Sequence, residues 1–187
     1  MARFDSGKNS QRAFASVNDI RRVFHEHRAE LEWLAYFITG NRVIAQACVT
    51  DACTASESRN NVFAEWLLTW ARHATIRSAI DTQHDRIKQI SASYENTAVV
   101  QPRHEPLTDE LLAVLAQNSD VLAGRLDVVS RAALLVCGVQ KNSIADAALM
   151  LGVNRAVAST AYCAALNSLE AVRCEHLAEE SGAAMRN

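Results

Sequence analysis

The sequence has little of what builds sheets, membrane spans or secreted domains. Only six of its 187 residues are glycine and two are proline. Runs of β-branched residues are short, so helices are favoured over strands. No apolar stretch reaches the roughly 18 residues that a membrane-spanning helix needs. Residues 1–12 are polar and lack an apolar core before a small-residue cleavage site, so we expect no secretory signal.

Cysteine and histidine are present, but not in the patterns of metal or catalytic sites. The five cysteines have no C-x-x-C spacing, and they lie at Cys48, Cys53, Cys137, Cys163 and Cys174. An odd number without a signal peptide predicts reduced, mostly buried thiols in the cytoplasm. His25 and His27 point to different sides of a helix, and Cys174-x-His176 is an isolated pair. Since phosphate-binding and nucleophile motifs are also missing, we predict no metal, no cofactor, no small-molecule substrate and no catalytic residue.

The chain has no excess of positive charge, and its two halves differ. Residues 1–92 contain 12 Lys and Arg against 10 Asp and Glu, a net charge of +2. Residues 93–187 contain 7 against 11, a net charge of −4. A domain that binds DNA on its own is usually strongly basic, so the composition argues against an independent DNA-binding protein.

What the chain does have is apolar residues, which make up 49% of it when alanine, cysteine and tyrosine are counted, and many of them recur at helical spacing. The periodicity and the cap residues predict helices at 16–39, 43–55, 62–90, 109–117, 125–137, 143–151 and 155–178. The first begins with a Ser16-x-x-Asp19 capping box and ends at Gly40. The third has Trp66 and Trp70 on its apolar face, is mostly polar after Asp81 and is expected to fray there.

The spacing of these helices predicts an all-α fold of two small domains. A helical bundle at 16–92 is followed by a linker at 93–107, where serines, Pro102 and Pro106 interrupt the helical period. A second helical domain follows at 108–178, and the segments 1–15 and 179–187 are expected to be flexible tails.

The most informative local pattern runs from Asp146 to Asn154. A helix-turn-helix needs a small residue where its two helices cross and a glycine four residues later, where the chain turns with a positive φ. Ala148 and Gly152 meet these needs, and Asn154 is placed to cap the next helix. An ordinary helical hairpin would show a similar glycine and cap. The pattern therefore predicts a helix-turn-helix in the second half, with that hairpin as the alternative.

The same segment resembles the C-terminal domain of bacterial sigma factors, in particular the two-domain extracytoplasmic-function class. Residues 150–154 read MLGVN and are similar to the family's L-G-[IV]-S corner. Residues 126–137, with Arg131, resemble its L-P-x-x-x-R-x-x-x-x-L lead-in, and Leu166 and Leu169 lie where the family ends its recognition helix. The resemblance implies a helix-turn-helix domain that binds the upstream promoter element.

The first half resembles the same family independently. Residues 42–53 are similar to the A-E-D-L-V-Q-E-x-F motif, with matches at Ala45, Val49 and Asp51. Residues 66–73 read WLLTWARH and resemble the W-L-x-x-I-A-R-N helix that engages the downstream promoter element. The two matches cover roughly residues 20–90 and 108–170 and follow the family's order. They imply a helical bundle that binds core RNA polymerase and promoter DNA.

Carried over residue by residue, the resemblance names candidate sites. Polymerase contacts would be Gln46, Thr50 and Asp51. Promoter contacts would be Arg59, Asn61, Trp70, Arg72, His73, Arg77, Arg155, Ser159 and Thr160. From spacing alone, Trp66 and Trp70 are instead expected in the core, and Arg72 and Arg77 fit a solvated surface equally well.

The sequence also departs from the family at both predicted interfaces. Gln46-Ala47 replaces an acidic pair, and Ser159, Ala161 and Ala164 stand where the recognition helix has cations. Each missing cation removes one counterion's contribution to DNA affinity. Three hypotheses follow. The first is a cytoplasmic sigma-like initiation factor with weak DNA affinity of its own, for which an anti-sigma factor would be a further partner. The second is a degenerate sigma-fold protein that binds a protein partner of the anti-sigma type without recognising promoters. An unrelated helical protein is the third.

Overall fold

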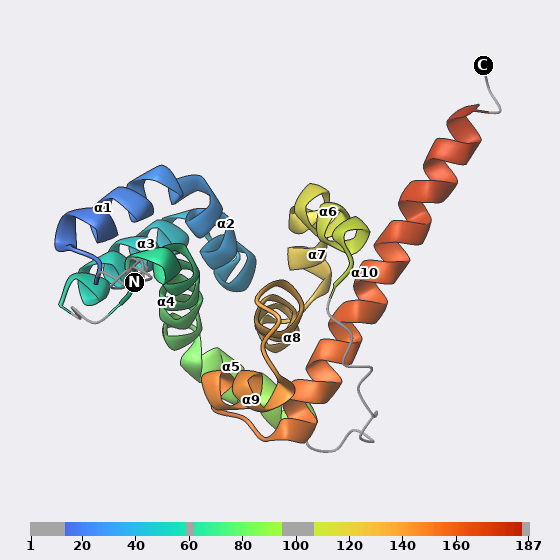
Figure 1. The fold of residues 1–187 in the computed structure, drawn as a ribbon. Coiled ribbons are helices and arrows are strands. Elements are labelled where there is room, and N and C mark those ends of the chain that lie inside the picture. Colours follow the sequence, from blue (N-terminus) through green and yellow to red (C-terminus); the bar gives the residue numbers. More distant parts are fainter. Residues whose placement is uncertain (1–13, 59–61, 95–106, 185–187) are drawn as a thin grey trace, which may run out of the picture.

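The computed structural model describes residues 14–58, 62–94 and 107–184, and of 179–184 only the backbone. These residues form α-helices and short helical turns (Figure 1). The described part contains no strand, only an isolated antiparallel bridge between Phe14 and Phe63. The predicted all-α fold is confirmed.

The helices before and after residues 95–106 form what we call the N-terminal and C-terminal halves. The N-terminal half comprises α1 (Val17–Glu26), α2 (Arg28–Thr39), α3 (Arg42–Glu57), the 3₁₀ turn η1 (Ala64–Trp66), α4 (Leu67–Thr82) and α5 (His84–Tyr94). The C-terminal half comprises α6 (Asp109–Gln117), α7 (Ser119–Arg125), α8 (Val128–Ala133), the π-helical turn η2 (Leu134–Val139), α9 (Ile144–Leu151) and α10 (Arg155–Ala184). α8 packs against both α2 and α10, and the C-terminal end of α10 extends beyond the other helices (Figure 1).

The first predicted helix is two helices. Its capping box is present, because Ser16 Oγ accepts a hydrogen bond from the Asp19 amide while the Asp19 carboxylate accepts one from the Ser16 amide. The chain leaves helical geometry at His27, with φ −103° and ψ 17°, and α2 begins at the next residue. The break contains neither glycine nor proline, and the apolar spacing of the sequence continues across it. A single helix was predicted for this reason. Gly40 ends α2 with a φ of 67°, as predicted.

The third predicted helix is also divided, and its last part does not fray. α4 ends at Thr82, and α5 follows after Gln83. α5 buries Ile87 completely and packs against α8 and α10, so the expected fraying after Asp81 is wrong. The expected burial of Trp66 is wrong as well, because its side chain is 54% exposed at the 3₁₀ turn that precedes α4.

In the C-terminal half α6 has the predicted bounds, but the next predicted helix begins later than expected. Asp127 caps α8 by accepting hydrogen bonds from the Val129 and Ser130 amides at 2.8 and 2.9 Å. α7 lies between the two predicted helices, and all but its last residue, Arg125, fall where no helix was predicted. Gly138, which directly follows the predicted helix end at 137, lies buried inside η2, where a Cβ would meet the Leu107 side chain at 2.8 Å. The absence of a side chain at Gly138 therefore lets Leu107 pack closely against η2, and no turn requires this glycine.

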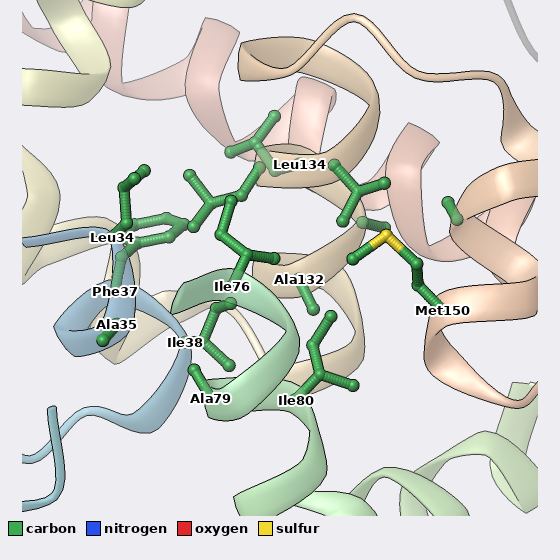
Figure 2. Close-up of a cluster of buried hydrophobic side chains, with 14 of the residues drawn as sticks. Leu34, Ala35, Phe37, Ile38, Ile76, Ala79, Ile80, Ala132, Leu134 and Met150 are labelled. Carbon is green, nitrogen blue, oxygen red and sulfur yellow. The ribbon is translucent and has the colours of Figure 1, made fainter. Parts of the chain in front are cut away.

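The two halves share one hydrophobic core. Figure 2 shows Leu34, Phe37, Ile38, Ile76 and Ile80 of the N-terminal half in the same cluster as Ala132, Leu134 and Met150 of the C-terminal half. Burial of this apolar surface stabilises the contact between the halves by roughly 25 cal/mol per Å².

The ends of the predicted domains differ in detail from the described structure. The predicted linker starts inside α5, which ends at Tyr94, and its residues 95–106 lie outside the described residues. The predicted N-terminal tail includes Ala15, which is buried and donates a hydrogen bond to the Val62 carbonyl (2.8 Å). Residues 179–184 of the predicted C-terminal tail continue α10. The division into two independent domains stays a prediction.

Among the described residues no single helix is long and apolar enough to cross a membrane. The one combination with sufficient length and apolar character is the bent pair of α9 and the first part of α10.

Candidate nucleic-acid interface

The corner between α9 and α10 has the geometry of a helix-turn-helix. The two helices bend through 106°, within the range of about 90–120° for the motif. Gly152 ends α9 in the left-handed region with a φ of 66°, which glycine adopts without strain. The Ala148 carbonyl accepts a hydrogen bond from the Val153 amide at 3.0 Å. The Asn154 side chain caps α10 by accepting one from the Val157 amide at 2.9 Å.

The start of α9 is fixed by a second capping box. Ser143 Oγ accepts a hydrogen bond from the Asp146 amide at 3.1 Å and donates one to the Asp146 carboxylate at 2.6 Å. The side-chain and backbone hydrogen bonds from Ser143 hold the pKa of Asp146 below its usual value. Local hydrogen bonds therefore fix the start of α9 and both sides of the corner.

The second helix of this motif is enclosed over its first turns. All six residues of the segment 157–162 are buried, among them Ser159 at 4% and Thr160 at 9% exposure. Since an α-helix turns once in 3.6 residues, six consecutive buried residues cover every face of the helix at that level. Of the three predicted promoter contacts on α10, only Arg155 is exposed. Ser159 and Thr160 are therefore buried in this structure, and their contact with promoter DNA stays a prediction.

In the N-terminal half, several predicted contacts come together in one groove. A cavity of about 530 Å³ between α3 and α4 is lined by Asp51, Trp70, His73 and Arg77. Trp70 stacks with His73 at a centroid distance of 6.4 Å, and its indole nitrogen donates a hydrogen bond to Ser56 Oγ at 3.1 Å. The groove therefore joins a predicted polymerase contact to three predicted promoter contacts.

The two arginines of this region are paired with carboxylates. Arg72 Nε lies 2.5 Å from a Glu30 oxygen, and Arg77 Nε lies 3.1 Å from an Asp81 oxygen. Both pairs are partly exposed, and such pairs contribute little to stability. Their main effect is on the local field, because each carboxylate lowers the positive potential that would attract a phosphate.

The three predicted polymerase contacts all lie on α3. Gln46, Thr50 and Asp51 are all exposed, and Val43 on the same helix is 75% exposed. Gln46 and Thr50 are four apart and lie on one side of the helix, whereas Asp51 is offset from Thr50 by about 100° and lines the groove with Trp70. This surface combines an exposed apolar side chain with amide, hydroxyl and carboxylate groups. Two of the predicted promoter contacts, Arg59 and Asn61, lie outside the described residues.

Sequence reasoning missed the polar residues that join the two halves. The Tyr36 hydroxyl donates a hydrogen bond to Asp120 at 2.9 Å. The Tyr94 hydroxyl donates one to Asp127 and is 2.8 Å from Ser130 Oγ. These partners are 84, 33 and 36 positions apart, and no local pattern links residues at such separations.

Arg131 is a third link between the halves. Its side chain is 4% exposed, and its Nη1 would lie 3.1 Å from a Cβ at Gly40, at the C-terminal end of α2. Burial and the nearby charge of Arg86 lower the pKa of Arg131. The negative end of the α2 dipole partly offsets the cost of burying this charge. We call the Tyr36–Asp120, Tyr94–Asp127 and Gly40–Arg131 contacts the junction.

The described residues offer no group of three or more His, Cys, Asp or Glu side chains that could hold a metal. None of the five cysteines forms a disulfide. Cys48 and Cys137 are buried, Cys53 and Cys163 partly so, and Cys174 is exposed. Only two of the five thiols are therefore fully buried, fewer than the expected majority.

No protein-family model, no curated protein and no solved structure matches this chain.

Proposed function

We propose that the chain is a sigma-like transcription initiation factor that binds core RNA polymerase and promoter DNA. The observation that carries the proposal is the corner at Gly152, where a 106° bend, a left-handed glycine and an Asn154 cap form a helix-turn-helix. Its sequence is the part of the C-terminal half that most resembles the family. Such a factor acts in the cytoplasm, where the polymerase is found.

The surfaces of α3 and α4 support the polymerase and downstream-promoter parts of the proposal. α3 presents Gln46, Thr50 and Asp51 to solvent, and the adjoining groove presents Trp70 and Arg77. A base can stack on an aromatic side chain while a cation holds its phosphate. Because polymerase binding would raise the effective concentration of promoter DNA, a weak intrinsic affinity for DNA is sufficient.

The alternative is a sigma-fold protein that binds a regulator of the anti-sigma type and recognises no promoter. The burial of Ser159 and Thr160 favours it, as do the carboxylates paired with Arg72 and Arg77. The two functions differ in whether the chain binds core RNA polymerase and directs initiation.

The deciding experiment is a titration of the purified chain against bacterial core RNA polymerase, followed by co-elution on a sizing column. The proposal predicts a one-to-one complex that Asp51→Arg weakens at least tenfold. Asp109→Arg makes the same charge change at an exposed position on α6 and should leave the complex intact. Absence of binding at micromolar concentration rejects the initiation factor and favours the regulator-binding protein.

A further inference from the structure

A second cavity, of about 400 Å³, lies where α2 and α4 meet the segment that leads into α9. It is lined by Trp33 of α2, by Arg72 and His73 of α4, and by Gln140 and Asn142 of the segment after η2. It has His73 in common with the 530 Å³ groove between α3 and α4. Small-molecule sites have volumes of about 300–1,000 Å³ and are common where two units of a fold meet, so both the size and the place suit a small ligand.

The amides of Gln140 and Asn142 form a pair in this lining. Asn142 Nδ2 donates a hydrogen bond to Gln140 Oε1 at 3.4 Å. This is the one hydrogen bond between these two side chains and the described residues, so Gln140 Nε2 keeps a donor and Asn142 Oδ1 keeps an acceptor. Adenine offers the complementary pair, an acceptor at N7 and a donor at the N6 amino group. Guanine presents two acceptors on that edge, so the amide pair favours adenine.

The backbone fixes this amide pair, because the Gln140 N–H donates a hydrogen bond to the Leu135 carbonyl at 2.9 Å. The Asn142 N–H donates one to the Val136 carbonyl at 3.1 Å. Lys141, between the two amides, has a φ of 58° and is the one non-glycine residue with a positive φ in the described part of the chain. Strained positions of this kind are enriched at ligand clamps. The pair is therefore preorganised, which lowers the entropic cost of binding.

Two aromatic rings in the lining are each supported by a neighbouring ring. Trp33 stacks with Phe37 at a centroid distance of 5.9 Å. His73 stacks with Trp70 at 6.4 Å. A planar base can stack on an aromatic side chain whatever its identity. Stacking therefore supplies affinity for any base, and the selection of adenine depends on the amides.

The Arg72 guanidinium supplies a contact for a phosphate. Its Nε is paired with a Glu30 oxygen at 2.5 Å, which fixes the orientation of the group. Its two Nη atoms have no partner among the described residues, and two such N–H groups can hold a phosphate side by side. The charges of Glu30 and Arg72 cancel, whereas grooves that bind nucleic-acid strands are positively charged. The cavity therefore suits a single nucleotide of low charge better than a strand.

We propose that this cavity binds a free adenine nucleotide of low charge, of which AMP is the simplest. The base stacks on the aromatic lining, the amides of Gln140 and Asn142 bind its N7 and N6 atoms, and Arg72 holds the phosphate. The proposal does not depend on the sigma-like function. Where that function applies, the nucleotide competes with promoter DNA for Arg72 and His73.

The experiment is isothermal titration calorimetry of the full chain with AMP and with GMP. We expect a dissociation constant for AMP on the order of 10 μM, as is usual for a ligand of this size, and about tenfold weaker binding of GMP. Gln140→Leu and Asn142→Leu should each weaken AMP about five- to tenfold. Asn142→Leu should also bring the AMP-to-GMP ratio close to one. Gln89→Leu makes the same change at an exposed position of α5 and should leave both constants unchanged.

The phosphate contact is tested separately, with AMP and adenosine. The parent chain should bind AMP several-fold more tightly than adenosine. Arg72→Met should remove this difference. Arg22→Met removes an arginine from an exposed pair with Asp19 and should keep it. These ratios do not depend on the fraction of folded molecules, so they stay informative if a variant is destabilised.

The outcomes are distinct. AMP binding with an adenine preference that Asn142→Leu removes supports the proposal. No AMP binding at millimolar concentration overturns it, and so does equal affinity for AMP and GMP in the parent chain. A single-stranded oligo(dA) that binds more tightly than AMP and is weakened equally by Gln140→Leu overturns the free nucleotide and assigns the cavity to a DNA strand. The titrations contain no polymerase, so their failure leaves the test of the sigma-like function unaffected.

Discussion

The Tyr94 hydroxyl at the end of α5 donates a hydrogen bond to the Asp127 carboxylate, which also caps the start of α8. One carboxylate thus fixes a helix start within the C-terminal half and connects that half to the N-terminal one. Burial, together with the Asp127 bond, raises the pKa of Tyr94 to about 12.

Stability should fall at high pH because of this shift. The folded chain keeps the Tyr94 proton up to a pKa of about 12, whereas an unfolded tyrosine loses it near 10.0. The folded state therefore binds more protons between these values, so its contribution is complete below pH 10 and is lost as the pH rises to 12. Denaturant unfolding at pH 8 and at pH 11 should show a smaller pH effect in Tyr94→Phe than in the parent chain. An equal pH effect would mean that Tyr94 titrates normally in the fold.

Replacing Arg131 should test the cost of its buried charge. Arg131→Met keeps much of the side-chain volume and removes the charge, so we expect the free energy of unfolding to rise by about 1 kcal/mol. Arg131→Lys keeps the charge without the guanidinium that reaches the Ala123 carbonyl and should lower it. Urea unfolding measures both, and the reverse order would show that the α2 dipole more than offsets the desolvation.

The glycine at the helix-turn-helix corner should not tolerate a side chain, although space is available. A Cβ at Gly152 would meet nothing within 4 Å, but its φ is 66°. Gly152→Ala should cost about 1 kcal/mol from backbone strain alone, a fall of a few degrees in Tm. Gly124→Ala, inside α7 and also without close neighbours, is the control and should leave Tm unchanged or raise it. Equal effects at the two sites would argue against strain.

The enclosure of α10 predicts the outcome of restoring a cation. Ser159→Arg would bury an unpaired charge and should destabilise the chain by about 3 kcal/mol or more. Asn167→Arg adds the same side chain at an exposed position of α10 and should change stability by less than about 0.5 kcal/mol. Thermal unfolding compares the two. If Ser159→Arg is as stable as the parent and binds duplex DNA more tightly, that face of α10 is accessible in solution.

The thiols should react in the order of their exposure. Cys174 is exposed and should be modified first by a small aromatic disulfide. Cys48 and Cys137 are buried and should react only when the chain unfolds. Burial and then Asp146 raise the pKa of Cys137 to about 12, and burial and Glu57 raise that of Cys53. Since the thiolate is the reactive form, both effects slow modification. Rapid reaction of Cys137 at neutral pH would contradict the packing of η2.

Much of the local structure was predictable because its causes are local. The capping boxes at Ser16 and Ser143, the left-handed glycines at positions 40 and 152 and the Asn154 cap depend on residues a few positions apart. Periodicity predicted the buried faces of α1 and α2 for the same reason. Helix breaks at His27 and Gln83 were missed, because no glycine or proline marks them and packing against other helices decides where they fall.

The candidate sites divide in the same way. Gln46, Thr50 and Asp51 were named from the family resemblance alone, and all three are exposed. The burial of Ser159, Thr160 and Arg131 and the two tyrosine bonds were not predictable, because they depend on helices far apart in the chain packing together.

The sequence by itself determined that the chain is helical, where most helices start and the helix-turn-helix corner, since hydrogen bonds and apolar spacing within a few residues fix these features. The tertiary structure alone decided which faces of those helices reach solvent. Exposure depends on contacts between residues far apart in the chain, and here those contacts leave Gln46 exposed and bury Ser159.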